Sequence, residues 1–288
     1  MPGKMYLRFW DVSHGACAML HHRVGETAGR LAMIDCGDTD DWNPADYITQ
    51  SMRRTRLDYL FITNADQDHM SGLQGVWDAG IHVAVFIKNP SFKADAFETV
   101  KRRSGELSSD ALRYKECLTK FTGEVTFPFN EHMGGITRET FWNKYPEFDD
   151  TNNLSLVIFI QYQGVGFLFP GDLEGPGWQK HLENPAFRTM LGRVDILCAS
   201  HHGRRSGYCE DVFEYCAPSA IVISDKSIVH DTQNMTQTYR NHVIRNHPDG
   251  VYVRTSQRRR HVLTTRRDGW IQFEVDDEGF SIDTEYQG

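Results

Sequence analysis

The sequence predicts an α+β protein in which two β-sheets pack face to face and helices cover their outer faces. Short apolar segments of strand length recur along the 288 residues, and a strand–strand–helix order in the first half returns in the second. Hydrophobic residues make up 40% of the chain, which is enough for a large core. No stretch rich in Pro, Gly or Ser separates the halves, so we expect one domain spanning residues 1–288.

The first half begins with segments that we expect to pair as strands. A continuous apolar run such as residues 57–62 is typical of a strand buried on both faces. Helices are predicted where proline opens residues 44–54 and where Ser71 precedes residues 72–77. The strands expected here are residues 6–10, 16–20, 30–35, 57–62 and 82–87.

An insertion is predicted at about residues 93–150. Residues 93–121 are charged and rich in helix formers, with Gly105 as a break. Residues 130–151 lack a clean period, so we expect an irregular segment there.

The second half repeats the opening theme. Gly164 marks the turn of a hairpin between residues 154–161 and 165–170. Further strands are expected at 194–199 and 220–224, followed by a closing meander at 252–255, 261–265 and 270–275. The helices expected between them are residues 178–183, 210–216 and 237–246.

Composition narrows the classes of function. The chain contains no run of eighteen apolar residues, and its first residues do not resemble a signal peptide, so we expect a cytoplasmic protein without membrane contact. The six cysteines lack CxxC spacing, which favours reduced thiols over a thiolate zinc site. The net charge of −8 argues against a general nucleic-acid coat. Residues 254–267 are nevertheless rich in arginine, which indicates either a solvated surface or a binding groove.

Residues 63–69, which read TNADQDH, are the most informative segment. They follow a buried strand directly, and Asp66, Asp68 and His69 place three possible metal ligands within four residues. An acidic turn that caps the next helix is the alternative interpretation.

Other expected strands also end in an acid or a histidine. Asp35, Asp172 and Asp225 each follow an apolar strand, and His201 and His202 follow another. Clustered carboxylates are costly unless they are paired or bind a metal. Together these strand ends predict a metal site at one edge of the sheets.

The chain resembles the metallo-β-lactamase superfamily, and within it the branch of the hydrolase domain of the DNA-uptake protein ComEC. The resemblance covers almost the whole chain except residues 93–150, and it implies a four-layer αββα sandwich, the metallo-β-lactamase fold. The segments that carry it are FWDVSHG at 9–15, DCG at 35–37, TNADQDH at 63–69, NLSLV at 153–157, GD at 171–172, HHG at 201–203 and RDGWI at 267–271.

The resemblance implies two divalent metal ions. One would bind Asp68, His69, Asp172 and His201, and the other would bind Asn64, Asp66, Asp172 and Asn153. Asn64 stands where the family has its first histidine, so the second ligand set is nearly all oxygen. Oxygen ligands favour Mn²⁺, with Zn²⁺ or Mg²⁺ as alternatives. The alternative interpretation of Asn64 is that the protein has lost one metal ion and its activity.

The implied reaction is metal-assisted hydrolysis of a phosphodiester, in DNA, RNA or a nucleotide. Asp68 would orient the attacking water, and His230 would protonate the leaving group or hold a phosphate. The loop that follows the strand at 194–199 contains four residues that are expected to contact the substrate. They are His202, Arg204, Arg205 and Ser206.

Two other functions stay open. The same fold could hydrolyse a thioester, lactone or amide, although such sites usually keep more histidines and bind zinc. It could also be a non-catalytic binding module that has lost a metal, for which Asn64 is the best argument.

Overall fold

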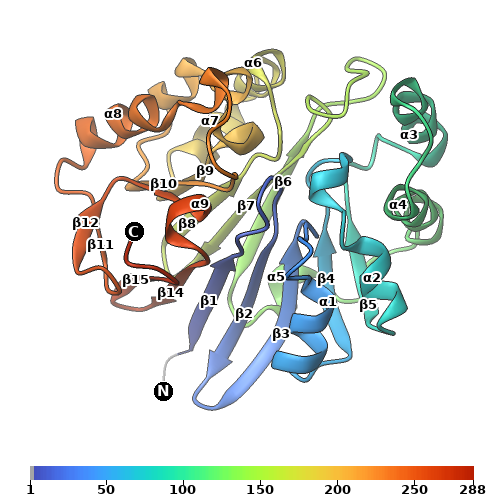
Figure 1. The fold of residues 1–288 in the computed structure, drawn as a ribbon, viewed down its shortest axis with the longest axis horizontal. Coiled ribbons are helices and arrows are strands. Elements are labelled where there is room, and N and C mark those ends of the chain that lie inside the picture. Colours follow the sequence, from blue (N-terminus) through green and yellow to red (C-terminus); the bar gives the residue numbers. More distant parts are fainter. Residues whose placement is uncertain (1–2) are drawn as a thin grey trace.

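The protein, seen in a computed structural model that describes residues 3–288, is built around two β-sheets that face each other (Figure 1). One group of helices covers the outer face of the first sheet and another covers the second, so the layers run helix, sheet, sheet, helix. The predicted αββα sandwich is therefore confirmed.

The first sheet has nine strands in the order β12-β11-β15-β14-β1-β2-β3-β4-β5. Strands β1 to β3 are antiparallel, whereas β3, β4 and β5 run parallel. Their bounds are β1 Lys4–Phe9, β2 Ala18–Val24, β3 Thr27–Ile34, β4 Arg56–Phe61, β5 His82–Ile87, β11 Val251–Val253, β12 Arg258–Arg260, β14 Ile271–Asp276 and β15 Gly279–Thr284.

The second sheet has six strands in the order β13-β10-β9-β8-β7-β6. Strands β8, β9, β10 and β13 are parallel, so their carboxyl ends meet at one edge. Their bounds are β6 Thr137–Trp142, β7 Leu156–Tyr162, β8 Val165–Phe169, β9 Ile196–Cys198, β10 Ala220–Ile223 and β13 Val262–Thr264.

Helices from consecutive parts of the chain cover each outer face. The first sheet is covered by α1 Pro44–Asp46 with the π-helix Tyr47–Ser51, α2 Leu73–Asp78, α3 Ala94–Lys101 and α4 Ser109–Lys120. The second is covered by α6 Gly175–Leu182, α7 Pro185–Leu191 and α8 Thr236–Asn246. The short helices are α5 Phe129–His132 and α9 Thr265–Asp268. In residues 3–288 no helix has the length and apolar character needed to cross a membrane.

Alternation along each strand divides the core into three layers. On β3, Ile34 points between the sheets while Met33 packs under the helices. On β7, Ile160 points between the sheets and Phe159 faces α6 and α7. All four side chains are buried. This two-sided burial fixes the register of the strands, and with it the positions of the loops at their ends.

Several predicted elements differ from the structure. The segment expected to be irregular contains β6, which pairs with β7 at the edge of the second sheet. The expected closing meander is wrong, because β11 and β14 belong to the first sheet and β13 to the second. The helix expected at 210–216 is a 3₁₀ turn, Glu210–Glu214. Helix α7 and strand β15 were not predicted.

Candidate metal centre

Two acids and two histidines converge at the edge where the parallel strands end. Asp68 and His69 lie in the 3₁₀ turn after β4, Asp172 follows β8, and His202 follows β9. One donor atom from each lies within 4.8 Å of the others. The Nε2 atom of His69 is 3.0 Å from Asp172 Oδ1, and that of His202 is 3.0 Å from Asp68 Oδ2. The two sheets thus contribute to one group, called the Asp68–His202 group below.

Unusual backbone conformations present these side chains. Gly171, next to Asp172, has a φ of +60°, and an added Cβ there would lie 2.8 Å from Ser155 Oγ. His202 itself has a φ of 55°. Non-glycine residues in this left-handed region carry strain that the surrounding structure must offset, and they cluster at functional sites.

Hydrogen bonds behind the two imidazoles aim their Nε2 atoms at the centre. Asp35 Oδ2 lies 2.9 Å from His69 Nδ1, and Asp35 also accepts hydrogen bonds from the backbone N–H and hydroxyl of Thr63. His202 Nδ1 donates to the carbonyl oxygen of Ser224 at 2.9 Å. Metal-binding histidines are typically oriented in this way. Asp35 therefore holds a predicted ligand in place.

The charges in the group stabilise one another. Burial alone raises the pKa of Asp68, but the neighbouring imidazole of His202 and the charge of His69 outweigh it and lower that pKa well below its usual value. Burial likewise raises the pKa of Asp172, and His69 and His202 lower it to about 2. Burial lowers the pKa of His69, but Asp172 and Asp35 raise it well above its usual value. The carboxylates therefore stay ionised and attract cations.

The donor atoms fit a divalent metal ion. His202 Nε2 is buried and its approach to Asp68 does not have the direction of a hydrogen bond, so this nitrogen has no hydrogen-bond partner within residues 3–288. A buried nitrogen in that state is costly unless something binds it. Two imidazole nitrogens and two carboxylates form a donor set that suits transition metals such as Zn²⁺, Fe²⁺ or Mn²⁺.

The predicted second ligand set is not assembled in the same way. Both carboxylate oxygens of Asp66 are occupied, Oδ1 by Lys101 Nζ at 2.7 Å and Oδ2 by the Thr151 hydroxyl at 2.8 Å. Asn64 Oδ1 accepts the backbone N–H of Asp66 at 2.8 Å, and its Nδ2 donates to Asn152. An ion at this position would therefore have to share or displace these partners.

Asn153 is also engaged in protein contacts. Its Oδ1 accepts hydrogen bonds from the backbone N–H groups of Glu174 and Gly177, and its Nδ2 donates to Asp150. The amide therefore holds the loop before β7 against the start of α6. Like Asn64 and Asp66, it has its side-chain oxygen hydrogen-bonded or paired within the protein.

The structure separates the roles of the two adjacent histidines differently from the sequence prediction. His201, predicted as a ligand, lies outside the Asp68–His202 group, with Nδ1 3.2 Å from Glu174 Oε1 and 3.0 Å from Ser206 Oγ. His202, predicted to contact substrate, lies inside the group. His201 instead forms part of a pocket wall.

The other residues predicted to contact substrate differ in their distance from the Asp68–His202 group. Arg204 is partly buried, and its Nη2 lies 3.2 Å from His14 Nε2. Arg205 and Ser206 are exposed. His230 is also exposed and caps the 3₁₀ turn Asp231–Gln233, so the structure does not bring it into the group.

Two residues near the group were not predicted as site residues. His14 lies 3.4 Å from Asp68 Oδ2 through Nε2, and its Nδ1 is 2.9 Å from Asp225 Oδ1. Asp225 is fully buried and also accepts a hydrogen bond from Gln233. Burial raises the pKa of Asp225, but its hydrogen bonds to His14 and Gln233 lower it below its usual value. The segment FWDVSHG contained the signal for His14.

An open pocket of about 620 Å³ lies over the group. Asp68, Asp172, His14 and His201 line it, together with Asp38 and other polar residues of the neighbouring loops. A substrate entering this pocket would reach two members of the group and both of these outer histidines.

A comparison with curated proteins finds ComE operon protein 3 of Bacillus subtilis (strain 168). The two are 27% identical over an alignment of 229 residues that covers 76% of this chain and 24% of the relative. This chain is similar to ComE operon protein 3 and has the metallo-β-lactamase fold. It spans about a quarter of the relative's length. No protein-family model matches the chain.

Solved structures show more distant likenesses. A putative metal-dependent hydrolase from Parabacteroides distasonis is 11% identical with a TM-score of 0.45, covering 90% of this chain and 93% of that one. CmlA, a diiron β-hydroxylase from Streptomyces venezuelae, is 14% identical with a TM-score of 0.43, covering 85% of this chain and 51% of that one. The fold of this chain follows from its own two sheets and flanking helices.

Proposed function

We propose that the protein is a metal-dependent hydrolase that cleaves phosphodiesters. The observation that carries the proposal is the Asp68–His202 group, in which two oriented imidazoles and two ionised carboxylates meet beneath an open pocket. A divalent ion bound there would polarise a phosphoryl oxygen and activate water for attack.

Asp68 is suited to orient the attacking water. Its side chain is 23% exposed, whereas those of His69, His202 and Asp172 are 5% exposed or less. It lines the pocket and stays ionised because its pKa is lowered. A carboxylate in that state can accept a hydrogen bond from water and hold it against the substrate.

Arg204 and His14 favour a phosphate substrate over a neutral one. Within residues 3–288, the Nε of Arg204 is buried without a hydrogen-bond partner, and its Nη2 reaches His14 at the pocket wall. Guanidinium groups match phosphate oxygens in geometry and charge. His14 lines the same pocket, with Nδ1 held by Asp225, and it anchors Arg204 there through Nε2.

The test is hydrolysis of bis(p-nitrophenyl) phosphate and of labelled oligonucleotides with added Mn²⁺, Zn²⁺ or Mg²⁺. We expect turnover that falls by about 1,000-fold in Asp172→Asn, because several kcal/mol of charge stabilisation is lost. Asp38→Asn is the matched control, since Asp38 lines the same pocket outside the group. Absence of phosphodiester cleavage with every metal would contradict the proposal and turn attention to thioesters, lactones or amides.

One observation favours a non-catalytic binding module as the second candidate. Asn64, Asp66 and Asn153 are all engaged by protein groups, which disfavours a second ion at these ligands. A protein that binds an oligonucleotide with the same affinity in wild type and Asp172→Asn, and that cleaves nothing, would fit that candidate.

A further inference from the structure

Lys101 reaches from the insertion to the loop that carries the metal-binding residues. It is the last residue of α3, and its Nζ lies 2.7 Å from Asp66 Oδ1. The side chain of Lys101 is 18% exposed and that of Asp66 is 32% exposed, so the pair is partly shielded from water. Other cations of this region pair within it, as Lys115 and Arg102 do with Glu98. Lys101 is thus aimed at the loop rather than at its own helix.

Two residues directly after the insertion also contact the loop that carries Asp66. The Thr151 hydroxyl donates to Asp66 Oδ2 at 2.8 Å, and Asn152 Oδ1 accepts from Asn64 Nδ2 at 3.2 Å. Asp66 and Asn64 are the residues that the family resemblance assigns to a second metal ion. Lys101 in the insertion and two residues directly after the insertion therefore hold both of them through side-chain contacts.

An ammonium group and a divalent cation compete for the same carboxylate. A second ion at Asp66 would have to displace Lys101 Nζ or accept a like charge close by, and the repulsion is stronger because the pair is partly buried. The replacement of an imidazole by Asn64 removes the ligand that could offset this cost.

We propose that the centre holds one divalent ion, and that Lys101 supplies at Asp66 the positive charge that a second ion would bring. The inference rests on the metal centre proposed above and not on its substrate. It gives the insertion a role in the site, which is to close the second metal position with its own cation.

The experiment counts bound Mn²⁺ per chain by native mass spectrometry and equilibrium dialysis in five proteins. They are wild type, Asn64→His, Lys101→Met, Lys101→Met with Asn64→His, and the control Lys115→Met, whose lysine pairs with Glu98. We expect one ion in wild type, in Asn64→His and in Lys115→Met. The double variant should bind two, and its Mn²⁺ electron paramagnetic resonance spectrum should show two coupled ions.

Lys101→Met alone should bind a second ion at least about tenfold more weakly than the double variant. Because Asn64 is buried, circular dichroism must show that the variants fold, and Lys101→Met with the isosteric Asn64→Asp replaces the double variant if histidine is not accommodated. Two ions in wild type would overturn the inference and leave the hydrolase proposal intact. One ion in every folded double variant would also overturn it. No ion in folded wild type would instead contradict the metal centre itself.

Discussion

His201 and His202 show how two identical neighbouring side chains acquire different tasks. Both residues adopt left-handed backbone conformations, with φ values of 50° and 55°. The tight turn sends the imidazole of His202 inward, where the Ser224 carbonyl fixes it, and that of His201 toward Glu174. The choice of ligand therefore depends on a carbonyl at the end of β10, which is 22 residues away in the sequence.

The metal affinities of His202→Gln and His201→Gln test this division. We expect His202→Gln to weaken the binding of one Mn²⁺ or Zn²⁺ by at least about 100-fold, because it removes an oriented ligand. His201→Gln should change the affinity by less than about threefold, because its imidazole lies outside the group. Isothermal titration of metal into each chelator-treated protein gives both values. The reverse order would restore His201 as the ligand that the family resemblance implies.

Much of the site could be predicted residue by residue, and the rest depended on contacts between distant segments. Asp68, His69 and Asp172 stand at strand ends in short motifs, so their convergence follows from the sheet topology. The contact of Lys101 with Asp66 joins residues 35 positions apart, through an insertion that no motif describes. Periodicity and strand-end position carry no information on such a pairing.

At the scale of elements, burial decided which predictions succeeded. Strands with two buried faces, such as β4 and β7, have continuous apolar runs and were predicted close to their true bounds. Strand β6 has no buried face, because it lies at an edge and only partly contacts the core, so its sequence shows no clear period. Strands β12 and β13 have three residues each, too few for a pattern to assign them to a sheet.

Helix α6 should make the stability of the protein depend on pH through His181. This histidine is 5% exposed and stacks on Phe187 with ring centroids 4.9 Å apart. Burial lowers its pKa from 6.5 to about 4. Between these two pH values, His181 is therefore protonated in the unfolded chain and neutral in the folded chain. The stabilising effect of neutral His181 is complete above pH 6.5 and is lost as the pH falls toward 4, by up to about 3 kcal/mol.

Urea denaturation of His181→Phe at pH 8 and pH 5 measures this effect. Phenylalanine keeps the ring stacking and removes the proton site, so the variant should lose less stability than wild type between the two pH values. His82→Phe, a change at an exposed histidine of β5, should keep the wild-type dependence. An unchanged pH dependence in His181→Phe would show that other groups set the acid sensitivity.

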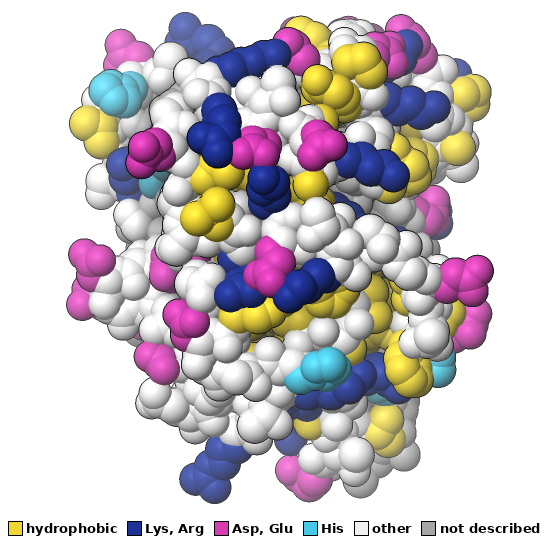
Figure 2. All heavy atoms as spheres, turned by 90° about the vertical axis from the view of Figure 1, so that its right-hand side faces the viewer, with side chains coloured by type: hydrophobic (Ala, Val, Ile, Leu, Met, Phe, Trp, Pro, Cys, Tyr) yellow, Lys and Arg dark blue, Asp and Glu magenta, His cyan; other side chains and the backbone are white. Residues whose placement is uncertain are grey.

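At the scale of the whole molecule, charge is distributed unevenly despite the net value of −8. The face that carries α3 and α4 mixes Lys and Arg with Asp and Glu (Figure 2). Near α9, by contrast, a pocket of about 380 Å³ is lined by five arginines and no acid. Its residues are Thr236, Arg240, Arg259, Arg260, His261, Val262, Thr264, Arg266 and Arg267.

A chain of contacts connects this arginine pocket with the metal centre. Thr265, beside Arg266, accepts a hydrogen bond from the backbone of Asp225, which in turn holds His14. Arg260 is paired with Asp268, but Arg266 has a buried Nη1 without a hydrogen-bond partner in the described part of the chain. Phosphates of a strand that extends beyond the reacting bond would match the positive charge of this arginine pocket.

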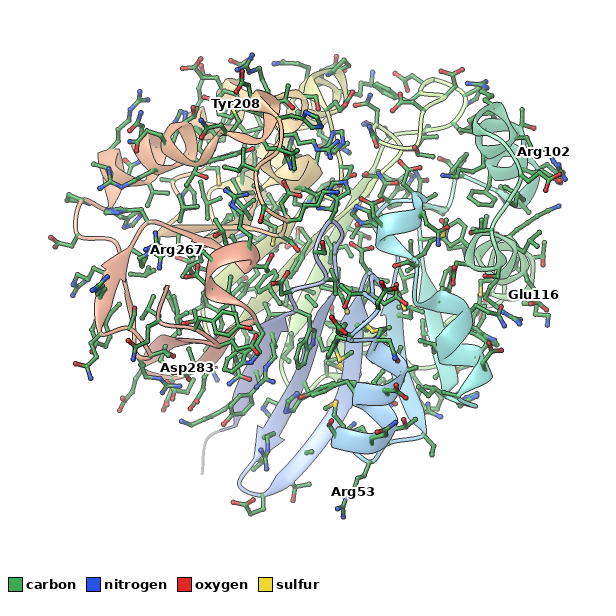
Figure 3. The ribbon with its side chains drawn as sticks, in the orientation of Figure 1. Arg53, Arg102, Glu116, Tyr208, Arg267 and Asp283 are labelled. Atoms are coloured by element: carbon green, nitrogen blue, oxygen red, sulfur yellow. The ribbon has the colours of Figure 1, made fainter. Side chains whose placement is uncertain are left out.

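Oligonucleotide binding by Arg259→Gln with Arg267→Gln tests whether the arginine pocket contacts the proposed substrate. In chelator, the double variant should bind a labelled single-stranded oligonucleotide more weakly, and its log–log salt slope should be smaller by about 1.4, from two lost phosphate contacts. Cleavage of bis(p-nitrophenyl) phosphate should not change, because that substrate is too small to reach the pocket. The control is Arg53→Gln with Arg102→Gln, which alters net charge equally at positions far from Arg267 (Figure 3). Equal losses in both double variants would mean that the general field of the protein, and not this pocket, attracts the strand.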